Sequence, residues 1–186
     1  SMTQGEFSRA ISSFGFMKIK LQYTSKSFQD AIVTNLYRTI PLTNAAGIGL
    51  ILQSLGKMSC KWSLLPSELQ LLLSTRVESL SPYPPQVLSS LLLGFRSLGI
   101  QWSKLPNSLR AELQTSIPCS DVITEQVLSN IIYALGGMQA QWSSQNDLSP
   151  ETKTKLLDGV RHVSKKLTAQ GASNTMWGLA KMSVKW

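Results

Sequence analysis

Few residues of the sequence have the type and spacing of a catalytic site. His162 is the single histidine, and it lies in a run from Val160 to Val163 that we expect to be helical. A general base needs a partner of defined geometry, and the sequence indicates none for this histidine. Cys119 and His162 are formally a nucleophile and a base, but no pattern brings them together. We therefore expect no catalytic residue and no enzymatic activity.

Metal and cofactor motifs are missing as well. The two cysteines are not spaced as metal ligands, and neither a glycine-rich phosphate loop nor a paired-carboxylate motif occurs. Two cysteines argue against a disulfide scaffold and fit a reducing intracellular compartment. Cys60 stands where the other copies of a repeat have Ile100, Ala140 and Val184, so it acts as a small apolar residue. We expect no metal, no cofactor and no small-molecule substrate.

The charge of the chain points to binding instead. Its 18 Lys and Arg residues against 10 Asp and Glu residues give a net charge of +8. A basic surface favours nucleic acids, anionic membranes or acidic proteins as partners. No apolar run reaches the length of about 18 residues that a membrane-spanning helix needs, so we expect no membrane span.

A phrase that ends in tryptophan recurs along the chain. Trp62, Trp102 and Trp142 are 40 residues apart, and Trp186 follows 44 residues later. A weaker first copy ends at Leu21, 41 residues before Trp62. The residues after the tryptophan repeat too, since WSLLPSELQLLL matches WSKLPNSLRAEL. Four extra residues within SSQNDLSP explain the longer last interval, and such insertions fall in loops.

Each half of the repeat has the apolar spacing of a helix. In the second copy Ile48, Ile51, Leu52, Leu55 and Met58 fall on one side of a helix with 3.6 residues per turn. Prolines suit the first turns, as at Pro66, Pro85 and Pro150, and the alternation typical of strands is absent. One helical hairpin cannot bury its apolar faces alone, so the copies must stack. We predict an all-α fold of about nine helices, an α-solenoid of about four and a half helix-turn-helix repeats of ~40 residues.

The repeat gives approximate unit boundaries of 3–43, 44–83, 84–123 and 124–168, with a half-unit at 169–186. We predict one repeat domain, 1–186, that is a fragment of a longer protein. The tryptophans stand at the end of each first helix. Because one bulky residue recurs in every unit, we expect these side chains to pack in the core rather than to read a ligand.

The last copy resembles a known repeat family. Ser173 to Met182 reads SNTMWGLAKM, which resembles the N-x-L-W-A-L-A-K-L phrase of octotricopeptide repeats. The heptatricopeptide repeats of organellar proteins are similar, as are tandem repeats in effectors of intracellular bacteria. The resemblance implies stacked helical hairpins that bind single-stranded RNA, with roughly one base per repeat. Gln53 and Leu93 depart from the family, which has an aromatic residue at the position of Trp177.

One face of each first helix varies between units while the apolar stripe stays constant. The variable positions hold Leu50, Gln53 and Lys57, then Ser90, Leu93 and Ser97, then Asn130, Tyr133 and Gly137, then Asn174, Trp177 and Lys181. Asn130 and Asn174 could hydrogen-bond to base edges, and Tyr133 and Trp177 could stack on bases. The same face could instead pack against neighbouring helices, with Leu50 and Leu93 as such contacts.

Lysines gather near the ends of the first helices, at Lys57, Lys61, Lys104, Lys181 and Lys185. A nucleic-acid strand that runs along the repeats would need such a row of cations to bind its phosphates. Cations at the C-terminal ends of helices also interact favourably with the helix dipole.

We therefore predict a non-catalytic binding module with two candidate partners. The first is single-stranded RNA, bound by Lys57, Lys61, Asn130, Tyr133, Asn174, Trp177, Lys181 and Lys185. The alternative is a protein partner, in which case the chain is a protein-interaction scaffold, for example that of a secreted bacterial effector. If the protein is a eukaryotic member of the family, we expect it in an organelle, a mitochondrion or a chloroplast. If it is a bacterial effector, we expect it in the host cytoplasm.

Overall fold

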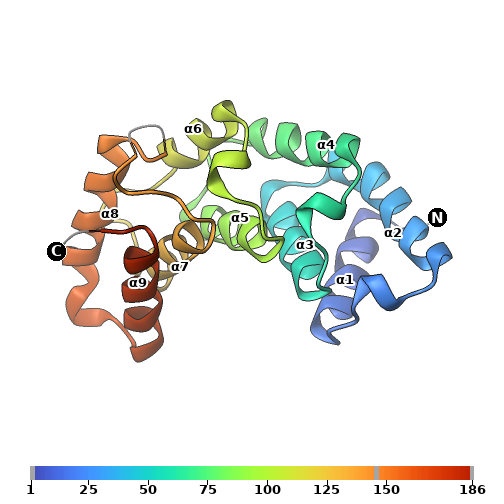
Figure 1. Cartoon of the computed structure of the whole chain (residues 1–186), viewed down its shortest axis with the longest axis horizontal. Helices are drawn as coiled ribbons and strands as arrows, with labels where there is room; N and C mark the ends of the chain where they lie inside the picture. The colour runs from blue at the N-terminus through green and yellow to red at the C-terminus, as the bar shows by residue number, and fades with distance from the viewer. Residues whose placement is uncertain (1–2, 145–146, 185–186) are drawn as a thin grey trace.

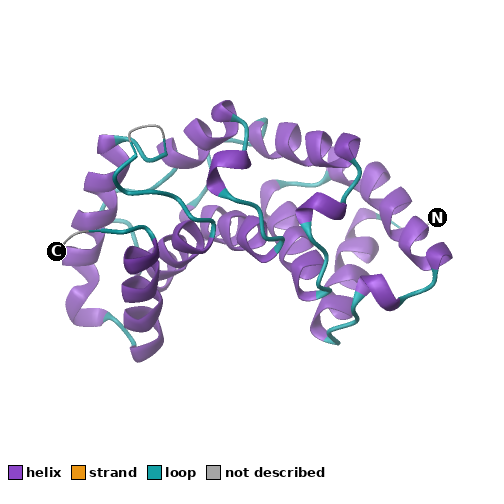
Figure 2. Cartoon of the chain, viewed as in Figure 1, coloured by secondary structure: helices purple, strands orange, loops and turns teal. Residues whose placement is uncertain are grey.

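The computed structural model describes residues 3–144 and 147–184, and these residues fold into helices joined by loops (Figure 1, Figure 2). They contain no strand, which confirms the predicted all-helical class. The nine α-helices of these residues are α1 (Gln4–Phe16), α2 (Lys26–Thr39), α3 (Ala45–Lys57), α4 (Ser67–Glu78), α5 (Pro85–Ser97), α6 (Asn107–Thr115), α7 (Glu125–Gly137), α8 (Pro150–Val163) and α9 (Ala169–Lys181).

The helices form two rows that together make an arch (Figure 1). Helices α1, α3, α5, α7 and α9 lie side by side on the concave side, each packed against the next. Helices α2, α4, α6 and α8 lie on the convex side, where α4 contacts both α2 and α6. We call these the inner row and the outer row. Equivalent helices of neighbouring copies therefore contact each other, as expected of a helical repeat.

Caps and prolines fix where several helices begin. Ser149 caps α8, because its side-chain oxygen accepts a hydrogen bond of 3.1 Å from the backbone N–H of Thr152. Pro85 and Pro150 are the first residues of α5 and α8, where a missing N–H costs nothing, as predicted. Pro66 lies one residue before the start of α4.

Every inner helix ends in the same way. The residue two places after its last residue has a left-handed backbone, with φ between 55° and 72°, at Lys18, Ser59, Gly99, Gln139 and Ser183. In α7, Gln139 N–H donates to the carbonyl of Gly136 and Ala140 N–H to that of Leu135, both at 3.1 Å. This pair of bonds is a Schellman motif, and it satisfies carbonyls at the helix end.

Only one of these five positions is a glycine, which leads to a prediction about stability. The left-handed conformation strains a residue that has a Cβ, whereas glycine adopts it freely. We expect Ser59→Gly to raise the free energy of unfolding by about 0.5 kcal/mol, after the extra backbone entropy of glycine is subtracted. Gly99→Ser should lower it by about 1 kcal/mol. Urea denaturation measures both, and a loss of stability in Ser59→Gly would contradict the prediction.

A backbone hydrogen bond joins each unit to the next. The residue at the tryptophan position donates its N–H to the carbonyl of the residue that follows the next inner helix. The four pairs are Leu21 to Met58 at 2.9 Å, Trp62 to Leu98 at 2.9 Å, Trp102 to Met138 at 2.7 Å and Trp142 to Met182 at 2.9 Å. The bond recurs at equivalent residues, so the units repeat in backbone geometry as well as in sequence.

The tryptophans pack in the core, but not at the predicted place in the chain. Trp102 is only 1% exposed, and Trp62 and Trp142 are partly buried against the same core. Trp186 lies outside the described residues. The expectation that the tryptophans end the first helices is wrong, because a left-handed turn intervenes. Trp62 and Trp102 open the 3-10 turns η3 (Trp62–Leu64) and η4 (Trp102–Lys104), while α3 and α5 have already ended.

The insertion between α7 and α8 packs against the outer row. The carboxylate of Asp147 lies 3.6 Å from the guanidinium of Arg110 on α6. The backbone carbonyl of Asp147 accepts a 2.8 Å hydrogen bond from the indole Nε1–H of Trp102. Ser149 N–H donates to the side chain of Gln114 at 2.7 Å. The inserted residues therefore connect α6 to the start of α8.

Candidate nucleic-acid interface

The excess positive charge is concentrated in the inner row. The inner helices and the residues just after them, 3–25, 44–66, 84–106, 124–144 and 169–184, contain eight Lys or Arg residues and only two Glu residues. The other described residues contain nine Lys or Arg residues and eight Asp or Glu residues, which nearly cancel. The inner row is therefore basic, whereas the outer row is close to neutral.

Arg9 lies in the first half of α1, whereas six lysines of the inner row gather at one end of its helices. We call this set the lysine edge, and it comprises Lys18, Lys20, Lys57, Lys61, Lys104 and Lys181. All six side chains are exposed, and none of them lies within 4.0 Å of a carboxylate in the described part of the chain. The two acids of the row, Glu6 and Glu125, lie in first turns at the other end of their helices.

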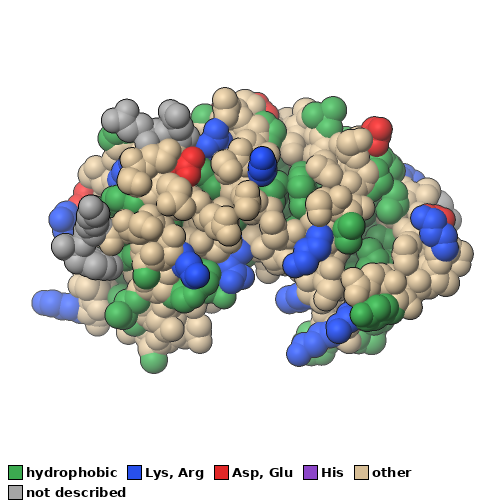
Figure 3. Space-filling model, viewed as in Figure 1, with side chains coloured by type: hydrophobic (Ala, Val, Ile, Leu, Met, Phe, Trp, Pro, Cys, Tyr) green, Lys and Arg blue, Asp and Glu red, His purple; other side chains and the backbone are tan. Residues whose placement is uncertain are grey.

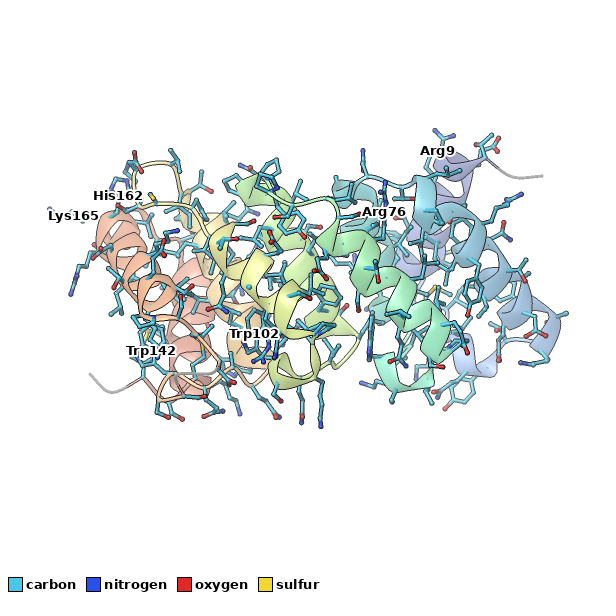
Figure 4. All side chains as sticks on the ribbon, turned by 90° about the horizontal axis from the view of Figure 1, so that it is seen from above. Arg9, Arg76, Trp102, Trp142, His162 and Lys165 are labelled. Carbon is cyan, nitrogen blue, oxygen red and sulfur yellow. The ribbon has the colours of Figure 1, made fainter. Side chains whose placement is uncertain are left out.

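Figures 3 and 4 help to locate the lysine edge. In Figure 4, Trp102 and Trp142 lie toward one long side of the molecule, whereas Arg9, Arg76 and His162 lie toward the opposite side. The labelled tryptophans follow the C-terminal ends of inner helices, so they mark the side of the lysine edge. Blue side chains border the hollow of the arch on both sides in Figure 3.

Three neighbouring inner helices bring aromatic and basic side chains together. The rings of Tyr133 on α7 and Trp177 on α9 are 4.9 Å apart between centroids, with a tilt of 49°. The guanidinium of Arg96 on α5 lies 3.9 Å from the Tyr133 ring and 5.5 Å from the Trp177 ring. The ammonium of Lys181 lies 5.7 Å from the Trp177 ring. Each cation is within reach of a ring face, so these four residues form one aromatic cluster.

Arg96 was not among the residues predicted from the sequence, and its place depends on a glycine in the next unit. Its guanidinium donates a 2.8 Å hydrogen bond to the hydroxyl of Tyr133. A Cβ on Gly137 would collide with Nε and Cδ of Arg96, so the glycine makes room for this side chain. The Nε of Arg96 is buried and has no hydrogen-bond partner among the described residues. The signal was present in the sequence, since Gly137 stands where other copies have Lys57 and Lys181.

The remaining predicted residues lie in different settings. Asn130 is half-buried on α7, and the side chain of Asn174 accepts a 2.9 Å hydrogen bond from Gln170. Lys57 and Lys61 are exposed near the end of α3, two inner helices from Tyr133 on α7 and three from Trp177 on α9. Lys185 lies outside the described residues. Tyr133, Trp177 and Lys181 are thus brought together, and Lys57 and Lys61 are not.

The variable face is partly a seam between helices. Gln53 donates hydrogen bonds to the backbone carbonyl and the hydroxyl of Ser90 on α5, at 3.0 and 2.7 Å. Leu93 is half-buried against the core, whereas Leu50 is 44% exposed. Ser97 donates hydrogen bonds to the carbonyl of Gly94 within α5, at 2.8 Å, and to the carbonyl of Leu52 on α3, at 3.4 Å. Contact with a neighbouring helix therefore explains Gln53 and Ser97, whereas ligand binding at the exposed positions of this face stays a prediction.

The residues considered for catalysis do not form a site among the described residues. His162 and Cys119 are exposed, and no hydrogen bond joins either side chain to another. No group of three His, Cys, Asp or Glu side chains in residues 3–144 and 147–184 is placed to hold a metal ion. None of the described helices is both long and apolar enough to cross a bilayer.

The two thiols should differ in reactivity. Cys60 is buried, as expected of a small apolar residue, and burial raises the pKa of its thiol. The thiolate is the reactive form, so Cys60 should react more slowly than the exposed Cys119 at any given pH. We expect an alkylating reagent at about pH 8 to modify Cys119 first, as followed by peptide mass spectrometry. Equal rates for the two thiols in the folded protein would contradict the burial of Cys60.

No known relative guides the interpretation of this surface. Neither protein-family models, nor curated proteins, nor solved structures match the chain. What the surface can do follows from its own chemistry. Exposed ammonium groups without carboxylate partners can bind phosphate oxygens, and the aromatic cluster presents Trp177, 37% exposed, for stacking.

Proposed function

We propose that the chain is a non-catalytic α-solenoid module that binds single-stranded RNA along its inner row. The single observation that carries this proposal is the partition of charge. Nearly all of the excess positive charge of the described residues belongs to the inner row, and within this part of the chain the lysine edge has no carboxylate partners. Unpaired ammonium groups spaced along a concave surface suit a polyanion, because each phosphate that they neutralise releases counterions.

The aromatic cluster would provide a stacking position beside the phosphates. A base could stack on the exposed part of Trp177, beside Arg96 and Tyr133, and Lys181 would lie near its phosphate. Stacking of this kind requires bases that are free of a duplex, which favours a single strand. The resemblance of the last copy to octotricopeptide repeats implies the same ligand.

A protein-interaction scaffold, such as that of a bacterial effector, is the alternative. Exposed apolar side chains on the inner row favour it, since Leu50 is 44% exposed and Met176 is 68% exposed. Apolar surface of this kind is typical of protein interfaces when it forms a contiguous patch. The lysine edge would then suit an acidic partner, so RNA binding and protein binding must be separated by experiment.

Fluorescence anisotropy of a labelled single-stranded RNA of mixed sequence tests the proposal. We expect saturable binding that is tighter for the single strand than for a duplex of the same sequence. Affinity should fall steeply between about 50 and about 200 mM salt. Absence of binding at the lower salt concentration would overturn the proposal for this chain, and a pull-down for a protein partner would follow.

A further inference from the structure

A basic pocket with an exposed aromatic side chain lies between the first two inner helices. It has a volume of about 520 Å³, within the range of small-ligand sites. Its lining comes from the ends of α1 and α3 and from the turns that follow them, and consists of Gly15, Phe16, Lys18, Lys20, Lys57 and Ser59. We call it the Phe16 pocket. Three of its six lining residues are cations, and none is an acid.

Phe16 is unusual in both its exposure and its position. Its side chain is 84% exposed, so it contributes little to the core. It occupies the position that holds Lys57, Ser97, Gly137 and Lys181 in the later inner helices. A phenyl ring that presents its faces to solvent beside lysines has the composition of a stacking site for bases. Tyr23 is also exposed, and the ammonium of Lys20, a lining residue of the pocket, lies 5.7 Å from its ring centroid.

The lysines of the pocket are not needed to satisfy the helix ends. In α1 the backbone N–H groups of Lys18 and Ile19 already donate to the carbonyls of Gly15 and Phe14, both at 3.1 Å. In α3 the equivalent bonds from the turn measure 2.9 and 3.0 Å. Since the backbone itself caps these carbonyls, the ammonium groups of Lys18, Lys20 and Lys57 stay available for another anion.

We infer that the Phe16 pocket binds one nucleotide of a single strand. The base stacks on the ring of Phe16, and the phosphate lies among the ammonium groups of Lys18, Lys20 and Lys57. This inference rests on the proposed function and deepens it, because it adds a second stacking position to the one at Trp177. The two positions lie in the first and last units of the inner row, so one strand that occupies both would extend from one end of the row to the other.

The test separates ring stacking from apolar contact by substitution at position 16. With a labelled single-stranded RNA of about 12 nucleotides, Phe16→Leu should weaken binding about tenfold, and Phe16→Trp should retain it. Tyr37→Leu, at an exposed aromatic residue of α2, is the matched control and should bind like the wild type. The melting temperatures of both Phe16 variants should agree with that of the wild type, because the side chain of Phe16 is exposed.

The lysines give an independent readout in the salt dependence. Lys18→Gln should reduce the slope of log affinity against log salt by about 0.7, the loss of one phosphate contact, whereas Phe16→Leu should leave the slope unchanged. If the wild type binds RNA and Phe16→Leu binds equally well, the pocket inference is overturned while the proposed function stands. If the wild type binds no RNA, both are overturned. A Lys18→Gln variant with wild-type binding and a lower melting temperature would assign this lysine to the helix end instead.

Discussion

Replacement of Trp102 by alanine is expected to lower the free energy of unfolding by about 4 kcal/mol. The side chain is almost fully buried, and its indole N–H donates a 2.8 Å hydrogen bond to the carbonyl of Asp147. The substitution would therefore leave a large cavity and an unpaired carbonyl, and would release the inserted residues from the core. Urea denaturation followed by circular dichroism measures the effect.

The other tryptophans of the same repeat position are the internal controls. Trp62 and Trp142 are only partly buried, so their alanine variants should lose clearly less stability than Trp102→Ala. Equal losses at all three positions would mean that the loss in free energy of unfolding depends on the position in the repeat and not on how deeply each side chain is buried. A loss below about 1 kcal/mol in Trp102→Ala would contradict the packing described for it.

Gly178→Ala is expected to detach α9 partly from the rest of the inner row and to cost about 3 kcal/mol. A Cβ at this position would collide with the backbone carbonyl oxygen of Ile132 on α7 and lie 2.7 Å from the carbonyl carbon. Backbone atoms of a helix cannot rotate away as a flexible side chain can, so α9 would have to move. Leu179 and Met182, now buried, would lose part of their packing.

Hydrogen exchange can locate this effect in the chain. Amides of α9 should exchange faster in Gly178→Ala, while those of α3 and α5 should change little. Gly5→Ala is a matched control, because nothing lies within 4 Å of a Cβ at that helical position. This control should be neutral or stabilising by up to about 1 kcal/mol. Unchanged protection of α9 in Gly178→Ala would contradict the close approach of the two helices.

The sequence predicted the helices well because two signals agreed. The apolar stripe fixed which side of each inner helix is buried, and Ile48, Leu52 and Leu55 are fully buried as expected. The recurring tryptophan fixed the period. The left-handed turn before each tryptophan could not be predicted, because only Gly99 carries the glycine that signals such a turn. The Schellman bonds instead enforce the same backbone on Lys18 and Gln139.

The candidate interface was predicted only in part, for a geometric reason. A helical wheel gives the direction of a side chain from its own axis, but not the distance to the neighbouring helix. It predicted that Tyr133 and Trp177 share a face, and their rings are in contact at a tilt of 49°. It did not predict that Gln53 would turn to Ser90, or that Arg96 would reach across to Tyr133. Such contacts depend on which residues of the neighbouring helix have small side chains, as Gly137 does beside Arg96.

The central claim, that the charge of the inner row binds RNA, is tested most directly by two double variants of equal net charge. Lys57→Glu/Lys181→Glu reverses two residues of the lysine edge, and Lys165→Glu/Lys166→Glu reverses two exposed residues just after α8. Single-stranded RNA binding by anisotropy should fall at least about tenfold, with a shallower salt dependence, in the first variant and stay near the wild type in the second. Equal losses in both variants would mean that only the net charge matters, and would contradict an interface on the inner row.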